Sequence, residues 1–389
     1  MKITRVECVP LMYTMKDMLY SGVGKFNQRP LLMVRVHTDE GIVGIGEAAT
    51  YGGPIVSTAT VIEKEIAPLV IGEDALQVER IWHKCYYASY QHARSGIYIA
   101  ALSGVDMAIW DAIGKYLGRP LYKLLGGFRD SIEVYASCGF YQEGKDVDTL
   151  VAEVKDKVAQ GFVGVKIKVG RTDSAFSLGT LKPFYREGIL TLEEDIERVR
   201  AVKKAVGPSI KVMVDANSAW SYADAVVAGR EFDKIGVYFF EEPIRADDYE
   251  NSARLADELS TRIAGYETEY LAANYRRIID MRAVDIIQPD LSWSGGITEC
   301  RKIAYLAHAN FIECAAHMYS SGILLAASLH FTCAIPNGAI LEYDTTDNAL
   351  RDELLTEPLL PKQGVLQPVD RPGLGIDINE DIVEQYRSH

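Results

Sequence analysis

The sequence predicts an α/β protein in which a (β/α) barrel follows a smaller α+β unit. From residue 131 onward, eight short apolar runs recur, and most of them alternate with helical segments, which is typical of repeated strand–helix units. The runs are nearly continuous in apolar residues, as expected of parallel strands buried on both faces. Three runs end in carboxylates, Asp215, Glu241 and Glu267, at intervals of 26 residues, about the length of one unit of a parallel barrel. This regular spacing favours a closed barrel over an open doubly wound sheet.

The first unit, residues 1–125, reads as a small sheet followed by long helices. A turn at Asp39-Glu40-Gly41 divides one apolar stretch into a hairpin. The last helical stretch carries apolar residues at positions 105, 109, 112, 113 and 117, the spacing of one helix face, and it ends at Gly118 and Pro120. The expected elements are strands over 3–11 and 31–48 and helices over 56–72 and 101–118.

The barrel is expected over residues 126–363. A tail over 364–389, rich in Gly and Pro, is expected to leave the barrel and pack back on the first unit. The eight predicted strands lie within the runs 132–140, 162–170, 210–217, 236–243, 262–269, 284–291, 311–318 and 339–344.

One connection of the predicted barrel is too long. Lys168 and Asp215 are 47 residues apart, and the excess, residues 170–191, follows the second strand at the mouth of the barrel. One hypothesis is a lid that brings Phe176, Phe184, Tyr185 or Arg186 near a substrate. The alternative is a peripheral or oligomer-contact loop.

Composition narrows the possible partners. The chain has 389 residues, 48% of them apolar and 24% charged, as in ordinary soluble enzymes. The net charge is −13 and no Lys/Arg run occurs, which argues against nucleic acid or an anionic membrane as a partner. Six cysteines are scattered without a CxxC pair, as expected of free thiols in a reducing compartment. With a charged N-terminus, and no apolar run judged long enough to cross a bilayer, the protein is expected in the cytoplasm.

The three evenly spaced carboxylates predict a metal site. Equivalent strand ends lie side by side around the mouth of a barrel. Three hard oxygen ligands converging there suit Mg²⁺ or a similar cation. Glu269 shares a face with Glu267 and is a rival ligand, but equal spacing favours Glu267. Glu242 is expected to point to the opposite face from Glu241 and to be structural.

Lys166 and Lys168 predict a base. Side chains two apart on a strand point the same way, and the apolar residues around them argue against an exposed edge strand. Each ammonium group repels the other, which would lower a lysine pKa toward neutrality and allow general base catalysis.

A second base system is predicted across the barrel. His317 ends the seventh apolar run and Asp290 ends the sixth. Adjacent strand ends can place a carboxylate against an imidazole, which orients the ring and raises its basicity. Glu342, on the eighth run, is either a protonated hydrogen-bond donor to a substrate oxygen or a structural acid.

Residues 44–49 match the glycine pattern of dinucleotide-binding loops. They belong to the returning arm of a hairpin and not to a βαβ crossover, so the context argues against nucleotide binding.

Taken together, these residues resemble the enolase superfamily, mandelate racemase subgroup, over essentially the whole chain. The matching elements are GVDMAIWD with PLYKLLGG, the Lys-x-Lys pair, DAN at 215, EEP at 241, Glu267, QPD with the following GG, AAHM at 317, and Glu342. The resemblance implies a modified (β/α)7β TIM barrel under an N-terminal α+β capping domain completed by the C-terminal tail. It also implies homo-oligomers, dimers or octamers. One departure is Tyr266 immediately before Glu267, where relatives commonly have Gly.

The resemblance also assigns roles. Asp215, Glu241 and Glu267 would hold one Mg²⁺ per site, with Mn²⁺ as a possible substitute. Lys166 would bind the substrate carboxylate, Lys168 and the His317–Asp290 pair would act on opposite faces of the α-carbon, and Glu342 would hydrogen-bond a carboxylate oxygen. Loops over 20–27 and 49–54 would cover the substrate, and the further candidate substrate-binding residues are Asn217, Tyr20 and Tyr51.

These roles favour removal of the proton α to a carboxylate, and the leading expectation is dehydration of an acid sugar, an aldonate or aldarate. Racemisation, epimerisation or cycloisomerisation through the same enediolate is the first alternative. The stretch 341–359 is similar to sugar-lactone cycloisomerases. A Schiff-base aldolase, which needs one buried lysine and no metal, is a remote alternative, and a non-catalytic metal-binding scaffold is another.

Overall fold

The computed structural model describes residues 1–50, 55–173 and 189–388. Tyr51 and the four residues proposed for a lid, Phe176, Phe184, Tyr185 and Arg186, lie outside these ranges.

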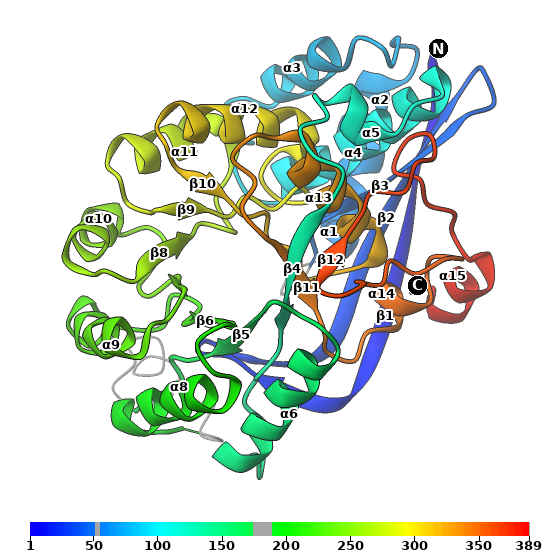
Figure 1. The fold of residues 1–389 in the computed structure, drawn as a ribbon. Helices are drawn as coiled ribbons and strands as arrows, with labels where there is room; N and C mark the ends of the chain where they lie inside the picture. Colours follow the sequence, from blue (N-terminus) through cyan, green and yellow to red (C-terminus); the bar gives the residue numbers. More distant parts are fainter. Residues whose placement is uncertain (51–54, 174–188, 389) are drawn as a thin grey trace.

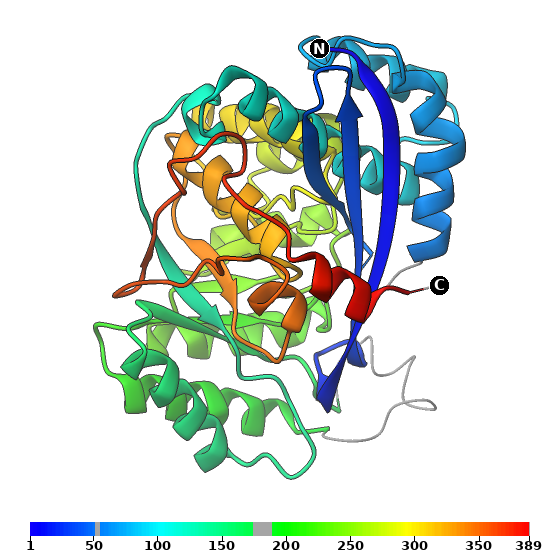
Figure 2. The same ribbon diagram turned by 90° about the vertical axis from the view of Figure 1, so that its right-hand side faces the viewer.

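The N-terminal region is an antiparallel sheet covered by helices (Figure 2). Its strands are β1 (Ile3–Tyr20), β2 (Lys25–Thr38) and β3 (Val43–Ala48), so the first strand is longer than expected. The expected helix over 56–72 forms in three pieces with a π-helical turn in the middle, directly before Pro68, which cannot donate a main-chain hydrogen bond. The helical elements are α1 (Ile55–Val61), η1 (Ile62–Ile66), α2 (Ala67–Val70), α3 (Val78–Ala88) and α4 (Ile97–Leu117).

Helix α4 packs directly on β3. A Cβ at Gly46 would lie 2.2 Å from the carbonyl oxygen of Gly104, and one at Gly44 would lie 1.9 Å from that of Ala108. The glycines of the dinucleotide-like pattern therefore serve close packing of a strand on a helix. By length and composition α4 could cross a membrane, so the expectation that no apolar run is long enough is wrong. It is 89% buried over its most apolar window, as a core helix is.

The second region is a ring of eight parallel strands with helices around it (Figure 1). Neighbouring strands pair in the order β10-β9-β8-β7-β6-β5-β4-β11. The ring closes where Cys314 donates to the carbonyl of Asn337 and accepts from Ala339, both at 2.9 Å. The strands are β4 (Ile132–Ser137), β5 (Gly164–Lys168), β6 (Lys211–Asp215), β7 (Phe239–Glu241), β8 (Arg262–Gly265), β9 (Ile286–Ile287), β10 (Glu313–Cys314) and β11 (Leu341–Asp344).

Within residues 126–173 and 189–363, one helix is described after each of the first seven barrel strands, which confirms the expected (β/α)7β order. The helices are α6 (Val147–Ala159), α8 (Leu192–Val206), α9 (Tyr222–Ile235), α10 (Tyr249–Glu258), α11 (Leu271–Asp280), α12 (Gly296–Ala309) and α13 (Gly322–Ala334). Short elements complete the chain: α5 (Leu121–Leu124), α14 (Ala349–Asp352), β12 (Val365–Leu366) and α15 (Glu380–Tyr386).

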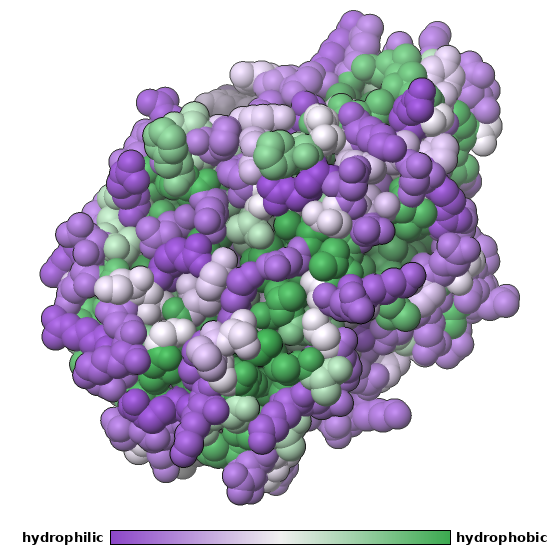
Figure 3. Space-filling view, in the orientation of Figure 1, coloured by the Kyte–Doolittle hydropathy of each residue, from purple (hydrophilic) through white to green (hydrophobic). Residues whose placement is uncertain are grey.

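Large side chains fill the ring itself. One buried cluster, which also includes two alanines, consists of Tyr135, Met213, Phe239, Ile286 and Ile340. The polar residues at the strand ends therefore lie next to a closely packed hydrophobic core. Hydrophilic residues dominate the outer surface, and hydrophobic residues show between them (Figure 3).

The C-terminal tail runs back along the N-terminal region. Leu374 donates a 2.7 Å hydrogen bond to Asp111 of α4, and Arg387 bridges to Leu11 of β1. Arg35 of β2 pairs with Glu380 of α15 at 2.7 Å. Boundaries near residues 125 and 363 stay predictions.

Candidate active site

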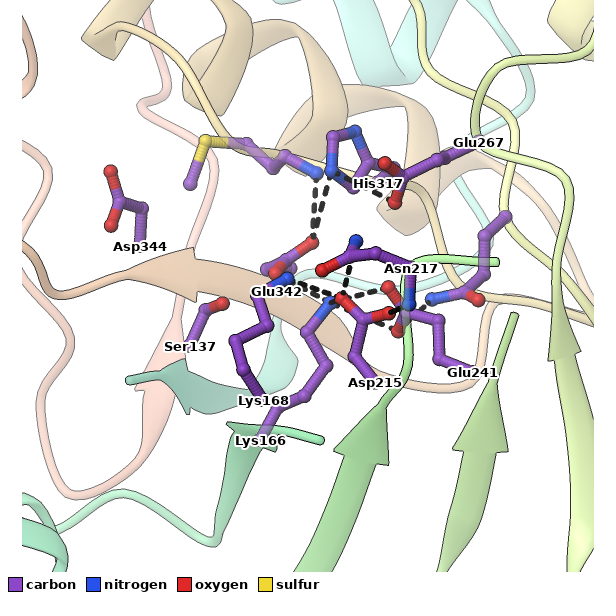
Figure 4. A network of polar contacts seen from close by, with 12 residues as sticks. Ser137, Lys166, Lys168, Asp215, Asn217, Glu241, Glu267, His317, Glu342 and Asp344 are labelled. Carbon is purple, nitrogen blue, oxygen red and sulfur yellow. Dashed lines mark hydrogen bonds and ion pairs between the residues drawn. The ribbon is translucent and has the colours of Figure 1, made fainter. Parts of the chain in front are cut away.

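The predicted metal ligands stand at the carboxyl ends of adjacent strands. Asp215 ends β6 and Glu241 ends β7, and the two residues pair directly in the sheet. Glu267 follows the end of β8 by two residues. All three are at least nine-tenths buried. The structure thus brings them to one mouth of the barrel (Figure 4).

The backbone after these strands is held in an uncommon conformation. Asn217, Ser218, Glu242 and Tyr266 have φ values of 47°, 62°, 39° and 74°. Left-handed backbone at non-glycine residues costs about 1–3 kcal/mol each and clusters at functional sites. Here it turns the chain sharply at the ends of β6, β7 and β8, which carry the carboxylates.

Both lysines of β5 reach these carboxylates. The Lys166 ammonium lies 2.7 and 2.9 Å from the two oxygens of Glu241 and 2.8 Å from Glu342. Lys168 is hydrogen-bonded to Asp215, its direct neighbour in the sheet. The expectation that both lysines point the same way is confirmed.

The expected lowering of the lysine pKa is wrong for this state of the site. Burial and the Lys166 charge do lower the pKa of Lys168, but Asp215 outweighs them and the net pKa is raised. Burial alone would raise the pKa of Asp215, yet Lys168 and Lys166 hold it below its usual value. Each lysine is therefore stabilised as a cation while its carboxylate partner remains beside it.

His317 faces the same space from the other side. Its Nδ1 lies 2.8 Å from Asp290, which confirms the expected pair, and its Nε2 lies 3.2 Å from Glu267. Asp290 is fixed in turn by the main-chain N–H and hydroxyl of Ser292, at 2.7 and 2.6 Å. Burial opposes the imidazolium, but Glu267 and Asp290 raise the pKa of His317 to about 10. The ring is therefore held in one orientation with Nε2 toward the carboxylates.

Glu342 is an ionised acceptor here. It pairs with Lys166 and accepts a 3.1 Å hydrogen bond from the N–H of Met318. Burial raises its pKa, but Lys166 and His317 outweigh burial and the net pKa is lowered. Of the two readings left open by the sequence, the protonated donor does not describe this state.

Sequence reasoning missed some residues and misplaced others. Gln288, within the QPD motif, donates to Glu241 at 2.8 Å, yet no role was expected for it. Glu242 does not point away from the site: it lines the same cavity and accepts a 3.0 Å hydrogen bond from Ser218. Glu269 lies elsewhere, bonded to Tyr249 at 2.5 Å.

The site opens into a cavity of about 500 Å³ between the N-terminal sheet and the barrel, within the size range of small-molecule sites. Asn217, Lys168 and His317 line it. Tyr20, expected over the substrate, is buried beneath the Arg171 guanidinium at 4.8 Å and does not line the cavity. The rest of the expected loop 20–27 does line the cavity, through residues between Ser21 and Phe26, and the lining continues to Pro30. Phe26 contacts Phe140 and Tyr319 of the barrel at ring separations of 5.8 and 6.1 Å.

The chemistry of the donor set fits a hard divalent cation. Burial raises the pKa of Glu241 well above its usual range, and Asp215, Glu342 and Glu267 raise it further against Lys166. A cation among these carboxylates would relieve that repulsion. Asn217 Oδ1 and Gln288 Oε1, beside the predicted ligands, are buried acceptors without a donor in the described part of the chain. Within the described ranges no three His, Cys, Asp or Glu side chains already stand as a metal-ligand set. Instead, the predicted ligands are paired with Lys166, Lys168 and His317.

Comparison with known proteins agrees with the fold and identifies the family. Residues 8–126 match the family described as "Mandelate racemase / muconate lactonizing enzyme, N-terminal domain", and residues 149–382 match "Enolase C-terminal domain-like". The chain is 39% identical to an arabinonate dehydratase from Saccharolobus solfataricus, over 92% of this chain and 90% of the relative. It is 33% identical to a D-galactarolactone cycloisomerase from Agrobacterium fabrum, over 100% and 99%. A Streptomyces coelicolor racemase solved with bound magnesium superimposes with a TM-score of 0.88 at 27% identity, over 99% and 100%.

Proposed function

Because the chain belongs to the mandelate racemase/muconate lactonizing enzyme family of the enolase superfamily, we propose that it removes the proton α to the carboxylate of an acid sugar. The leading reaction is dehydration of an aldonate or aldarate. The observation that carries the proposal is that two buried proton-transfer groups, Lys168 and His317, line one cavity, while Lys166 next to them pairs with Glu241 and Glu342.

The chemistry explains why such a site needs so much fixed charge. An α-proton of a carboxylate is very weakly acidic, and its removal builds a second negative charge on the carboxylate. Hydrogen-bond donors fixed where that charge grows act more strongly in a buried site than in water. Each stabilises the transition state by about 2.7–4 kcal/mol. Held by Asp215, Glu241 and Glu267, Mg²⁺ would supply a divalent positive charge beside the substrate carboxylate, and Mn²⁺ is expected to substitute for it.

Lys166 is the side chain best placed to receive the substrate carboxylate. Its ammonium group already bridges two carboxylates, Glu241 and Glu342, so an acid oxygen of the substrate would meet a cation fixed from two sides. Glu342 is held by the Met318 N–H. In its protonated form it would donate a hydrogen bond to a carboxylate oxygen of the substrate as charge grows there.

Dehydration then needs one base and one acid. Lys168, neutral once Asp215 no longer stabilises its ammonium form, takes the α-proton. The electrons of that C–H bond form a carbon–carbon double bond, and the bond from the β-carbon to its hydroxyl breaks. His317 donates a proton from Nε2 to the departing hydroxyl, which leaves as water. Because Nδ1 is tied to Asp290, Nε2 is the nitrogen available for this step. The enol product tautomerises to a 2-keto-3-deoxy acid.

Cycloisomerisation of a sugar lactone is the second candidate. It is supported by the likeness to D-galactarolactone cycloisomerase over the whole chain. The same two groups would serve it, with the lactone oxygen as the leaving group in place of hydroxide. A homo-oligomer, a cytoplasmic location and the lack of nucleic-acid or membrane partners stay predictions.

A screen of acid sugars and their lactones with Mg²⁺ in D₂O tests the proposal. Loss of water with formation of a keto acid supports the dehydratase, ring opening without water loss supports the cycloisomerase, and deuterium at the α-carbon alone supports a racemase or epimerase. Borohydride trapping of a substrate adduct in the presence of chelator would instead indicate a Schiff-base aldolase. Absence of α-proton exchange with every acid sugar, lactone and epimer would contradict the proposal.

A further inference from the structure

A buried carboxylate of the N-terminal sheet reaches the barrel next to the active site. Glu47, in β3, is 1% exposed. Its Oε2 accepts hydrogen bonds from the Ser321 hydroxyl and, at 3.2 Å, from the main-chain N–H of Leu324. Ser321 is also the N-cap of α13. Glu47 therefore binds the first turn of a barrel helix from the neighbouring region of the chain.

The helix start that Glu47 holds is directly joined to His317. Three residues separate His317 from Ser321 along the chain, and two of them, Tyr319 and Ser320, line the cavity with His317. Asn348 supports this segment by donating a 2.7 Å hydrogen bond to the carbonyl of Ser320. A shift of the α13 start would therefore move the imidazole.

The end of β3 also reaches Asp290, the hydrogen-bond partner of His317. The N–H of Ala49 donates to the carbonyl of Ser292 at 3.1 Å. Ser292 in turn gives both its N–H and its hydroxyl to Asp290, which orients the ring. Two residues apart, Glu47 and Ala49 thus contact the loops on which His317 and Asp290 lie.

Packing alone does not explain a carboxylate at this position. Burial raises the pKa of Glu47 to about 7, against hydrogen bonds from the serine hydroxyls and Leu324, so keeping the acid there opposes folding near neutral pH. An apolar residue would fill the space without that cost. A carboxylate oxygen facing free N–H groups at a helix N-terminus instead fixes the position of that helix.

We propose that Glu47 is a positioning residue that sets His317 against the substrate. It acts through the start of α13 and, with Ala49, through the Asp290 loop. The proposal rests on the proposed function, because it takes His317 as the proton-transfer group of one substrate face. Lys168 lies within β5, whose hydrogen bonds run to β4 and β6. Glu47 therefore reaches the His317 face through the chain itself, whereas the same segment meets the Lys168 face only through the Tyr319 ring, 5.9 Å from the Lys168 ammonium.

The test uses acid sugars that are epimers at the α-carbon, because one epimer presents its α-proton to Lys168 and the other to His317. Deuterium exchange at each epimer is measured for the wild type, Glu47→Ala, Glu47→Gln and Asp111→Asn. Asp111 is the matched control: it is a fully buried carboxylate that binds the N–H of Ile45 in the same strand at 2.8 Å. Its other main-chain partner is Leu374 of the tail, so it does not reach the His317 loop.

We call the two substrates the His317 epimer and the Lys168 epimer, after the residue that the α-proton faces. For Glu47→Ala we expect exchange at the His317 epimer to fall about 100-fold, the effect of a displacement of about 1 Å. Exchange at the Lys168 epimer should stay within about threefold of wild type. Glu47→Gln keeps an acceptor oxygen and should recover most of the loss. Asp111→Asn should leave the ratio between the epimers unchanged. Ser321→Ala, which removes one donor and leaves Glu47 in place, should shift the ratio in the same direction and serves if Glu47→Ala does not fold.

Equal losses at both epimers, or an unchanged ratio in every Glu47 and Ser321 variant, would overturn this proposal while leaving the proposed function intact. Wild-type exchange at neither epimer would overturn the proposed function and this proposal with it.

Discussion

Lys168 and His317 face one cavity but are held in different ways. Lys168 is part of a strand, and its sheet neighbour Asp215 is also its hydrogen-bond partner. His317 lies three residues beyond the end of β10, in a loop fixed by Asp290 and followed by the helix start that Glu47 binds. The hydrogen bonds that hold Lys168 therefore come from the barrel, whereas the His317 face depends on hydrogen bonds between two regions of the chain.

The two halves of the chemistry can therefore fail separately. Damage to the sheet register would remove the Lys168 face and the predicted metal ligands together. Damage to the contact between β3 and α13 would leave Lys168 and the predicted ligands on β6 and β7 in place.

Removal of the metal should abolish exchange on both faces, by at least about 1,000-fold, because a divalent charge at the substrate carboxylate contributes several kcal/mol. Dialysis against a chelator followed by exchange assays checks this, and added Mg²⁺ should restore both epimers. Added Mg²⁺ should also raise the melting temperature of the wild type and not of Asp215→Asn. If chelation lowered exchange at one epimer only, the two faces would not share one metal-dependent site.

Lys168→Ala should lower exchange about 100- to 10,000-fold at the epimer facing the lysine, the usual range for a general base. The other epimer should retain exchange through His317. Lys211→Ala is the control. Lys211 stands at the opposite end of β6 from Asp215, where it pairs with Glu133 of β4. If both epimers exchange as in the wild type, Lys168 is not the base.

Asp290→Asn should lower exchange at the His317 epimer about 10- to 100-fold, because hydrogen bonds to charged groups contribute about 1.5–3 kcal/mol. The variant keeps the size of the side chain but cannot stabilise an imidazolium. The Lys168 epimer is the internal control. An equal effect on the two epimers would argue that Asp290 acts on the fold as a whole.

The smallest effect concerns stability. His330, on α13, accepts from the N–H of Tyr122 and donates to the carbonyl of Leu374, both at 3.1 Å, and burial lowers its pKa to about 4. The pKa of His330 in the folded protein lies below the ordinary value of 6.5. The neutral imidazole therefore contributes fully to the free energy of unfolding above pH 6.5, and this contribution is lost as pH falls toward 4. Between pH 7 and pH 5 the wild type should lose about 2 kcal/mol through this group.

Unfolding curves of wild type and His330→Gln at the two pH values check this. The variant should show a loss about 2 kcal/mol smaller, and His308→Gln, at an exposed position of α12, should behave like wild type. Exchange by the folded variant should keep the wild-type ratio of the two epimers. A changed ratio would show that all of α13, and not its first turn alone, positions His317.

The Lys168 face was the more predictable half. Strand periodicity placed Lys166 and Lys168 on one side, and even spacing placed the carboxylates at neighbouring strand ends. The direction of the lysine pKa was missed because it depends on Asp215 standing opposite Lys168 in the sheet. Glu242 was misplaced because its φ of 39° breaks the alternation of side chains that holds within a strand.

The His317 face was only half predictable. The pairing with Asp290 follows from adjacent strand ends, but Glu47 lies 270 residues before His317, and no local pattern indicates their connection. Similarly, β1 continues past its apolar run to Tyr20 because pairing with β2 stabilises residues whose own sequence does not favour a strand.

The glycines of the N-terminal region suggest where this fold is free to change during evolution. Gly46 precedes Glu47 and has no room for another atom beside Gly104, whereas a Cβ at Gly24, on the cavity wall, would meet nothing within 4 Å. New side chains can therefore enter the cavity at Gly24 and alter which sugars fit, without moving the strand that carries Glu47. Substrate range can diverge among descendants of this protein while the handedness of proton transfer is inherited unchanged.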